Sequence, residues 1–172
     1  FRQRNQYLLS YIAIWVGIGS VLAFLLPSAG PCYYEHFIGP SPDFAGLHQA
    51  LVAAQSAAGA PLTALSNQEG LLKLFGGNEL AVGAGISAMP SVHNGLAVLF
   101  AIGAWKVNRY AGMVFAAYAA LIWVGSIHLG WHYALDGVVA ALLTFVIWRV
   151  AGKATDRLGQ PTSTPEPKTA LA

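Results

Sequence analysis

Residues 7–26 read YLLSYIAIWVGIGSVLAFLL, a run of twenty uncharged and mostly apolar residues. A helix needs about 20 residues to cross the roughly 30 Å hydrocarbon core of a bilayer. The run is too long for the apolar region of a signal peptide, which has about 7–15 residues. Residues 90–105, 110–127 and 132–148 are three further apolar stretches. The sequence therefore predicts an all-α, multi-pass transmembrane bundle with about four spans.

The amino-acid composition excludes an ordinary soluble domain. Of the 172 residues, 56% are hydrophobic and 9% are charged, whereas soluble domains carry about 25% charged residues. Such a chain cannot cover its surface with polar groups, so we expect the lipid bilayer to surround it. The net charge of +2 is too small to indicate a nucleic-acid partner. Cys32 is the single cysteine, which excludes an intrachain disulfide framework.

The cations are placed unevenly along the chain. Lys73 is the only one in the long connection 27–89, and the other eight precede the first span, lie between the second and third, or follow the fourth. Cytoplasmic segments of membrane proteins carry an excess of Lys and Arg. The pattern therefore predicts a cell-membrane protein in which connection 27–89 is extracytoplasmic. The cytoplasmic set is Arg2, Arg4, Lys106, Arg109, Arg149, Lys153, Arg157 and Lys168.

Two segments lie outside the predicted spans. In the outer connection we expect two short interfacial helices, one over residues 42–55 with apolar residues at helical spacing. The other is predicted from Ser66 and Glu69, which match a capping box, before an apolar run that Gly76 and Gly77 would end. Residues 151–172 contain three prolines and are predicted to form a disordered cytoplasmic tail, after a membrane-embedded domain over 1–150.

The segment that opens the second span is suited to binding an anion. Pro90 is expected at the first helical position, where its missing N–H group costs nothing. The backbone N–H groups of Ser91, Val92 and His93 would then point outward at the positive end of the helix dipole, which is a favourable place for phosphate. His93 adds a side chain that can donate a proton.

The segment that opens the fourth span contains a histidine and a carboxylate. His132 and Asp136 are four residues apart and are expected on one face of a helix. Asp136 would accept a hydrogen bond from one imidazole nitrogen and leave the other nitrogen as a nucleophile. The alternative is a structural ion pair that fixes the span.

Both segments resemble signatures of one enzyme family. SAMPSVH at 87–93 and GSIHLGWHYALD at 125–136 look like the second and third signatures of the type 2 phosphatidic acid phosphatase superfamily. The MPS-x-H and HY-x-x-D forms are most similar to its inositol phosphorylceramide synthase-like branch. The resemblance implies metal-independent catalysis without a cofactor: His132 attacks phosphorus to form a phosphohistidine, Asp136 orients it, and His93 protonates the leaving oxygen. Water or an acceptor alcohol then takes the phosphoryl group.

The chain departs from the superfamily pattern in three respects. Ser126 stands where the third signature usually has an arginine, and the first signature, K-x6-RP, is absent, because Leu80 follows Lys73 at the arginine position. Four spans are predicted instead of six, and Phe1 is not an initiator methionine, so we expect that further spans and cations precede it or that residues 32–36 contribute to the site. As the only outer cation, Lys73 is a candidate for a phosphate contact.

These features predict an integral membrane lipid phosphatase or phosphotransferase with its active site on the extracytoplasmic face. The apolar surroundings favour a membrane lipid phosphate as substrate, and a homo-oligomer is left open. One alternative is a metal- or haem-binding membrane subunit that uses His93, His128 and His132. Another is a non-catalytic assembly partner that supplies half of a site.

Overall fold

The first predicted span is a single continuous helix with a change of helical geometry in its middle. The computed structural model describes residues 2–76 and 87–158, in which every regular element is a helix. Helix α1 (Arg2–Ala13) continues as the π-helical segment η1 (Ile14–Leu22) and ends with α2 (Ala23–Leu25). The polar residues 2–6 are therefore helical as well, ahead of the apolar run that identifies the span.

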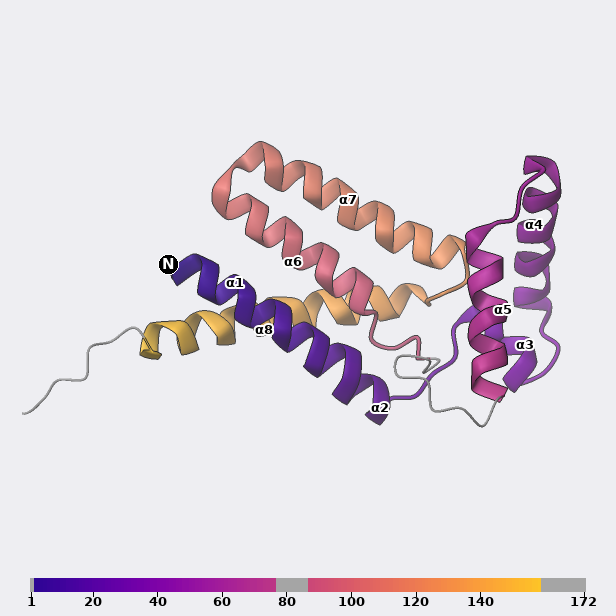
Figure 1. Cartoon of the computed structure of the whole chain (residues 1–172), viewed down its shortest axis with the longest axis horizontal. Coiled ribbons are helices and arrows are strands. Elements are labelled where there is room, and N and C mark those ends of the chain that lie inside the picture. The colour runs from indigo at the N-terminus through magenta and orange to yellow at the C-terminus, as the bar shows by residue number, and fades with distance from the viewer. Residues whose placement is uncertain (1, 77–86, 159–172) are drawn as a thin grey trace, which may run out of the picture.

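The other three predicted spans are also helices. Helices α6 (Val92–Val107) and α7 (Arg109–His128) form an antiparallel pair joined at Asn108 (Figure 1). The Asn108 side chain caps α7 by accepting a hydrogen bond from the backbone N–H of Tyr110 at 2.7 Å. Helix α8 covers Ala134–Leu158. Among the described residues, three helices are long and apolar enough to cross a membrane, namely Arg2–Leu25, α7 and α8, whereas α6 is shorter at 16 residues.

Helix α8 is longer than the sequence predicts. Its 25 residues correspond to about 37 Å, more than the roughly 30 Å hydrocarbon core. The predicted disorder of 151–172 is therefore wrong for residues 151–158, and the rest of that segment lies outside the described residues. Two hydrogen bonds join the C-terminal part of α8 to α1. Gln6 donates from Nε2 to the Trp148 carbonyl at 2.9 Å, and Arg2 donates from Nη2 to Asp156 Oδ2 at 2.7 Å.

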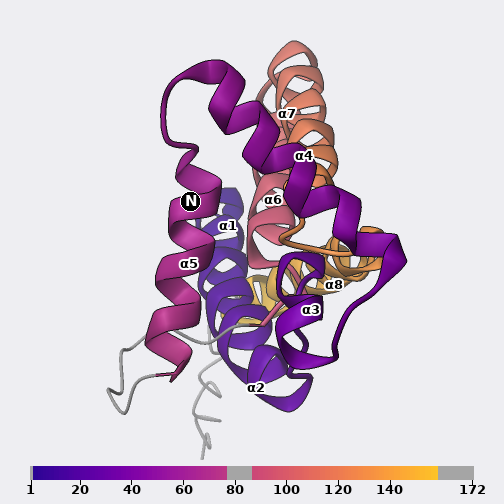
Figure 2. The same cartoon turned by 90° about the vertical axis from the view of Figure 1, so that its right-hand side faces the viewer.

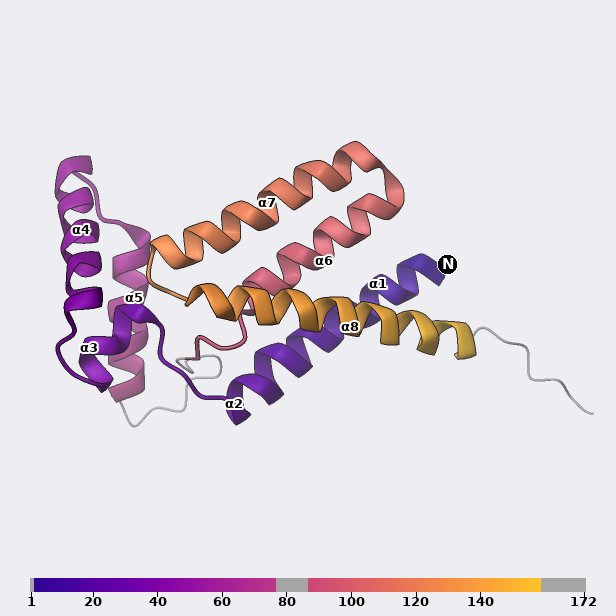
Figure 3. The same ribbon diagram turned by 180° about the vertical axis from the view of Figure 1, so that it is seen from behind.

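The core of the bundle lies where the first span, α6 and α8 meet. Ile14 and Ile18 of η1 pack against Leu99 of α6, and all three side chains are fully buried. Gly95 of α6 faces Thr144 of α8, whose hydroxyl donates to the Gly95 carbonyl at 3.2 Å. Small residues allow membrane helices to approach closely. Figure 3 shows α1 crossing behind α8, with the α6–α7 pair above them.

The outer connection contains the two predicted helices, with a different start for the second. Helix α4 covers Pro42–Ala58 and α5 covers Thr63–Gly76, after the short elements η2 (Pro31–Tyr33) and α3 (Tyr34–Phe37). The predicted capping box is wrong, because Ser66 lies inside α5, with its N–H bonded to the Leu62 carbonyl at 3.2 Å. The helix begins a turn earlier because Leu62 N–H is bonded to Gln55 Oε1 and Leu65 is buried. Gly77 lies outside the described residues.

Helices α4 and α5 lie across one end of the spanning helices (Figure 1), and Figure 2 looks onto that end. At the opposite end lie the start of α1, the α6–α7 junction and the end of α8. Seven of the eight cations assigned to the cytoplasm belong to those three segments, and Lys168 lies outside the described residues. The fold thus separates the cation-rich end from the outer helices, in agreement with the sequence pattern.

Candidate functional site

The site forms where the segment before α6 meets the segment before α8. Helix α6 begins at Val92, and Ser91 is its N-cap, with its side chain accepting from the Asn94 N–H at 3.4 Å. Pro90 therefore precedes the cap and isn't the first helical residue, which corrects the sequence prediction. The first N–H groups of a helix have no intrahelical acceptor. Those of Val92 and His93 are thus available for an anion, whereas the Ser91 N–H lies outside the helix.

His132 lies between α7 and α8, outside the spanning helices, and its tautomer follows from its neighbours. Its Nδ1 is 2.7 Å from the Ala88 carbonyl oxygen. A carbonyl can only accept, so Nδ1 carries the proton and Nε2 carries the lone pair of the neutral ring. Ser91 Oγ lies 3.0 Å from Nε2 and donates its hydrogen to it. The lone pair that this histidine could offer to a reacting atom is therefore on Nε2.

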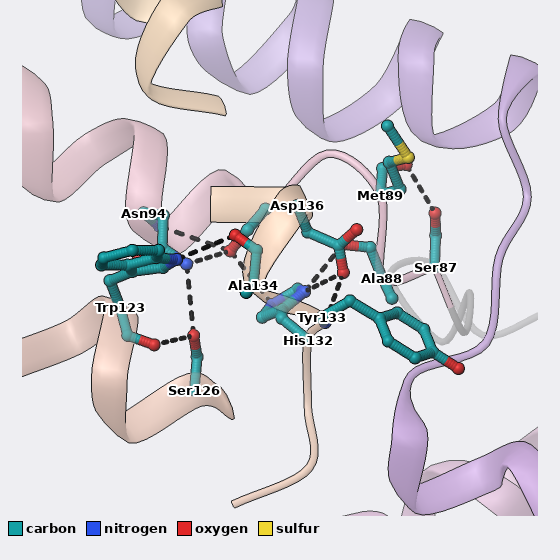
Figure 4. A network of polar contacts seen from close by, with 11 residues as sticks. Ser87, Ala88, Met89, Asn94, Trp123, Ser126, His132, Tyr133, Ala134 and Asp136 are labelled. Atoms are coloured by element: carbon teal, nitrogen blue, oxygen red, sulfur yellow. Dashed lines mark hydrogen bonds and ion pairs between the residues drawn. The ribbon is translucent and has the colours of Figure 1, made fainter. Parts of the chain in front are cut away.

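Asp136 is a neighbour of His132, as predicted, but it doesn't hold the ring by a hydrogen bond. The distance from Asp136 Oδ2 to His132 Nδ1 is 3.7 Å, which is an ion-pair distance and too long for a hydrogen bond. The same oxygen accepts from the Tyr133 N–H at 2.8 Å, which caps the start of α8. Figure 4 shows the carboxylate beside the imidazole. The orienting acceptor is the Ala88 carbonyl, and Asp136 acts on His132 through its charge.

A chain of hydrogen bonds behind Ser91 was not predicted from the sequence. Asn94 donates from Nδ2 to Ser91 Oγ at 3.0 Å and lies 3.3 Å from Ser126 Oγ. Ser126 in turn donates to the Trp123 carbonyl at 2.8 Å. Ser126 occupies the position where the superfamily usually has an arginine. This departure is the feature of the sequence that could have indicated a role for Ser126 in the site. Ser91 thus has its acceptor sites filled by Asn94 and its hydrogen directed at His132.

His93 and His132 line the same cavity, which has a volume of about 730 Å³. None of the described residues that line it is Lys or Arg. Lys73 is exposed on α5 and is not part of the lining. Among the described lining residues, the groups that could contact a phosphate oxygen are therefore the His93 side chain and the backbone N–H groups at the start of α6. The remaining lining residues are Ser66, Asn67, Gly70, Leu71, Leu74, Leu121, Ile122, Gly125, Ser126, Leu129 and Trp131.

Burial lowers the pKa of His132. The Ala88 carbonyl and the Asp136 carboxylate oppose this effect, and the nearby charge of His93 adds to it. A lowered pKa keeps the imidazole neutral at neutral pH. The ring is then in the state that a nucleophile requires.

The other candidate residues lie apart from this pair. His128 is the exposed last residue of α7 and does not line the cavity. Within residues 2–76 and 87–158, no group of three His, Cys, Asp or Glu side chains could hold a metal ion. Glu35 and His36 border a separate cavity of about 200 Å³ under α4. Residues 32–36 thus do not contribute to the cavity that His93 and His132 share.

Comparison with known proteins identifies a family. A family model described as the PAP2 superfamily matches residues 1–150. The matched range includes the outer helices and both segments that build the site. Members of this superfamily generally hydrolyse phosphate esters. A search of curated proteins and a search of solved structures each found no significant match.

Proposed function

This chain belongs to the PAP2 superfamily, and from that premise we propose that it is an integral membrane lipid phosphatase or phosphotransferase that forms a phosphohistidine on His132. The observation that carries the proposal is the state of the His132 ring. Its Nδ1–H is held by the Ala88 carbonyl, which leaves the lone pair on Nε2, and the His132 side chain lines a cavity that His93 also lines. A nucleophile and a proton donor at one cavity are the groups that a two-step phosphoryl transfer needs.

The first step breaks the phosphate ester. The phosphate displaces the Ser91 hydroxyl from Nε2, and that hydroxyl and the N–H groups of Val92 and His93 bind the phosphate oxygens. The Nε2 lone pair then forms a bond to phosphorus while the ester P–O bond breaks. The His93 imidazolium gives its proton to the leaving oxygen. Asp136 stabilises the positive charge that develops on His132.

The second step regenerates the enzyme. Neutral His93 accepts a proton from water or from an acceptor alcohol, whose oxygen attacks phosphorus. The N–P bond breaks, and its electron pair returns to Nε2. The forms of the two motifs favour the inositol phosphorylceramide synthase-like branch, in which an alcohol would be the acceptor. The position of His132 at the end of the bundle opposite the cations supports an extracytoplasmic active site.

The covalent intermediate provides the test. The purified full chain in mixed micelles is mixed with [³²P]dodecyl phosphate, quenched in alkali and separated from free label. We expect acid-labile, alkali-stable label on the wild type and none on His132→Ala. His128→Ala is the matched control, because it removes a histidine four residues away that does not line the cavity, and it should label like the wild type. Equal labelling of His132→Ala and the wild type would overturn the mechanism.

A further inference from the structure

The shared cavity extends well beyond the histidines. Leu71 and Leu74 of α5 form one side, and Leu121 and Ile122 of α7 form the other. Leu121 precedes Ser126 by five residues, or about 7 Å along the helix axis. The apolar lining therefore continues more than one helical turn from the polar groups towards the middle of the spanning helices. A small soluble phosphate would make no use of this part.

The apolar part of the cavity continues onto the lipid-facing surface of α7. The Leu121 side chain lines the cavity and is 71% exposed. In the most apolar stretch of α7, 11% of the residues are buried, so the described residues leave most of this helix uncovered, as in a helix that faces lipid. A hydrocarbon chain can thus reach the cavity directly from the bilayer, without passing through water.

Two glycines leave the interior of the cavity unfilled. Gly70 of α5 and Gly125 of α7 both line it, and a Cβ atom built on either would meet no protein atom within 4 Å. Gly137 of α8 shows the contrast, because a Cβ there would lie 2.3 Å from the Trp123 ring. Gly70 and Gly125 therefore do not serve close helix packing, and what they provide is space.

The α5 wall is fixed in place. Gln68 is 6% exposed and donates from Nε2 to the Leu129 carbonyl at the end of α7, at 2.9 Å. The Tyr33 hydroxyl donates to the Gln68 carbonyl at 3.3 Å. These bonds join α5 to both the end of α7 and the start of the outer connection, so the cavity has a defined width.

We propose that the cavity between α5 and α7 binds the hydrocarbon chain of the phosphate substrate next to its ester bond, with Gly70 and Gly125 setting the room for that chain. This proposal rests on the proposed function and goes further by naming the part of the chain that selects the substrate. It requires a phosphate ester with a long alkyl or acyl chain. Specificity then depends on apolar contacts with the outer helix α5 as well as on the phosphate.

The first test compares substrates with and without a chain. kcat/KM is measured in mixed micelles for dodecyl phosphate and p-nitrophenyl phosphate with the wild type, Gly70→Leu and Gly125→Leu. Each methylene moved out of an apolar site costs roughly a factor of four, so losing room for two of them should lower the dodecyl-to-nitrophenyl ratio on the order of tenfold. Gly46→Leu is the matched control, because Gly46 of α4 also faces open space but does not line the cavity. It should leave the ratio unchanged.

The second test measures binding without turnover. Dodecylphosphonate has a non-hydrolysable C–P bond, and bromine near its phosphonate end quenches tryptophan fluorescence on contact. Trp131 lines the cavity, so its share of the quenching is the difference between the wild type and Trp131→Phe. We expect this share to be clear in the wild type and in Gly46→Leu, and to require on the order of tenfold more phosphonate in Gly70→Leu.

The two tests separate the two proposals. If the wild type releases phosphate from neither substrate but Trp131 is quenched as expected, the proposed function fails and the chain-binding cavity stands. If both substrates are hydrolysed but Gly70→Leu keeps the wild-type ratio and the wild-type quenching, the chain-binding cavity is wrong and the phosphatase activity stands.

Discussion

Replacing Asp136 by asparagine separates the charge of this residue from its role in the helix cap. Asparagine keeps an oxygen that can accept from the Tyr133 N–H, so the start of α8 should persist. What disappears is the attraction between the carboxylate and a positive His132 ring. At 3.7 Å and an effective dielectric constant of about 20, that attraction amounts to about 4 kcal/mol. A loss of this size in the transition state corresponds to about 10³ in rate.

The assay is the pH dependence of kcat/KM for dodecyl phosphate in micelles. The wild type should lose activity on the acid side as His132 gains a proton, with a midpoint below the ordinary histidine pKa of about 6.5, because burial lowers the pKa of His132. The Asp136 carboxylate raises that pKa. In Asp136→Asn, the acid limb of the pH profile, where kcat/KM falls with pH, should therefore move to lower pH. The maximum value of kcat/KM, the plateau of the profile, should also fall. A purely structural defect would lower the plateau without moving the limb.

A matched control comes from the other end of the same helix. Asp156 is paired with Arg2, and both side chains are largely exposed, so Asp156→Asn should change stability little and kcat/KM not at all. If Asp136→Asn stayed within about threefold of the wild type, with an unmoved acid limb, the electrostatic role assigned to Asp136 would be refuted.

Three further predictions concern the proton donor, metals and topology. His93→Ala should lose about 10²–10⁴ in kcat/KM on dodecyl phosphate and much less on p-nitrophenyl phosphate, whose leaving group needs little protonation; equal losses would exclude His93 as the acid. Phosphate release should persist in EDTA, because a histidine nucleophile needs no cation, and complete loss restored by zinc would contradict the mechanism. In a Cys32→Ser background and in intact cells, an impermeant maleimide should label a cysteine introduced at Gln49 and not one at Lys153, and the reverse result would invert the orientation.

The spans and the site segments could be predicted because their signals are local. Hydropathy locates α7 within one residue at each end, since a lipid-facing helix must be apolar along its length. The ends were less predictable. Helix α8 runs on to Leu158, and its last turns lie beside α1, where Arg2 is hydrogen-bonded to Asp156, a residue 154 positions away in the sequence that local patterns cannot pair with it. The start of α5 was misplaced for a similar reason, because Gln55 of another helix binds the Leu62 N–H.

The sequence alone predicted helices long and apolar enough to cross a membrane and cations gathered at one end, and it proposed His93, His132 and Asp136 as the candidate catalytic groups. These conclusions follow from hydropathy, charge and short-range spacing, which do not depend on how the helices pack. The tertiary structure alone decided which atom holds the His132 ring. The Ala88 carbonyl belongs to a segment 44 residues away. Because every residue has a backbone carbonyl, the residue type at position 88 does not indicate that it accepts this hydrogen bond. The same holds for the cavity, since its walls, α5 and α7, are far apart in the sequence and are joined in the fold by the hydrogen bond from Gln68 to the Leu129 carbonyl.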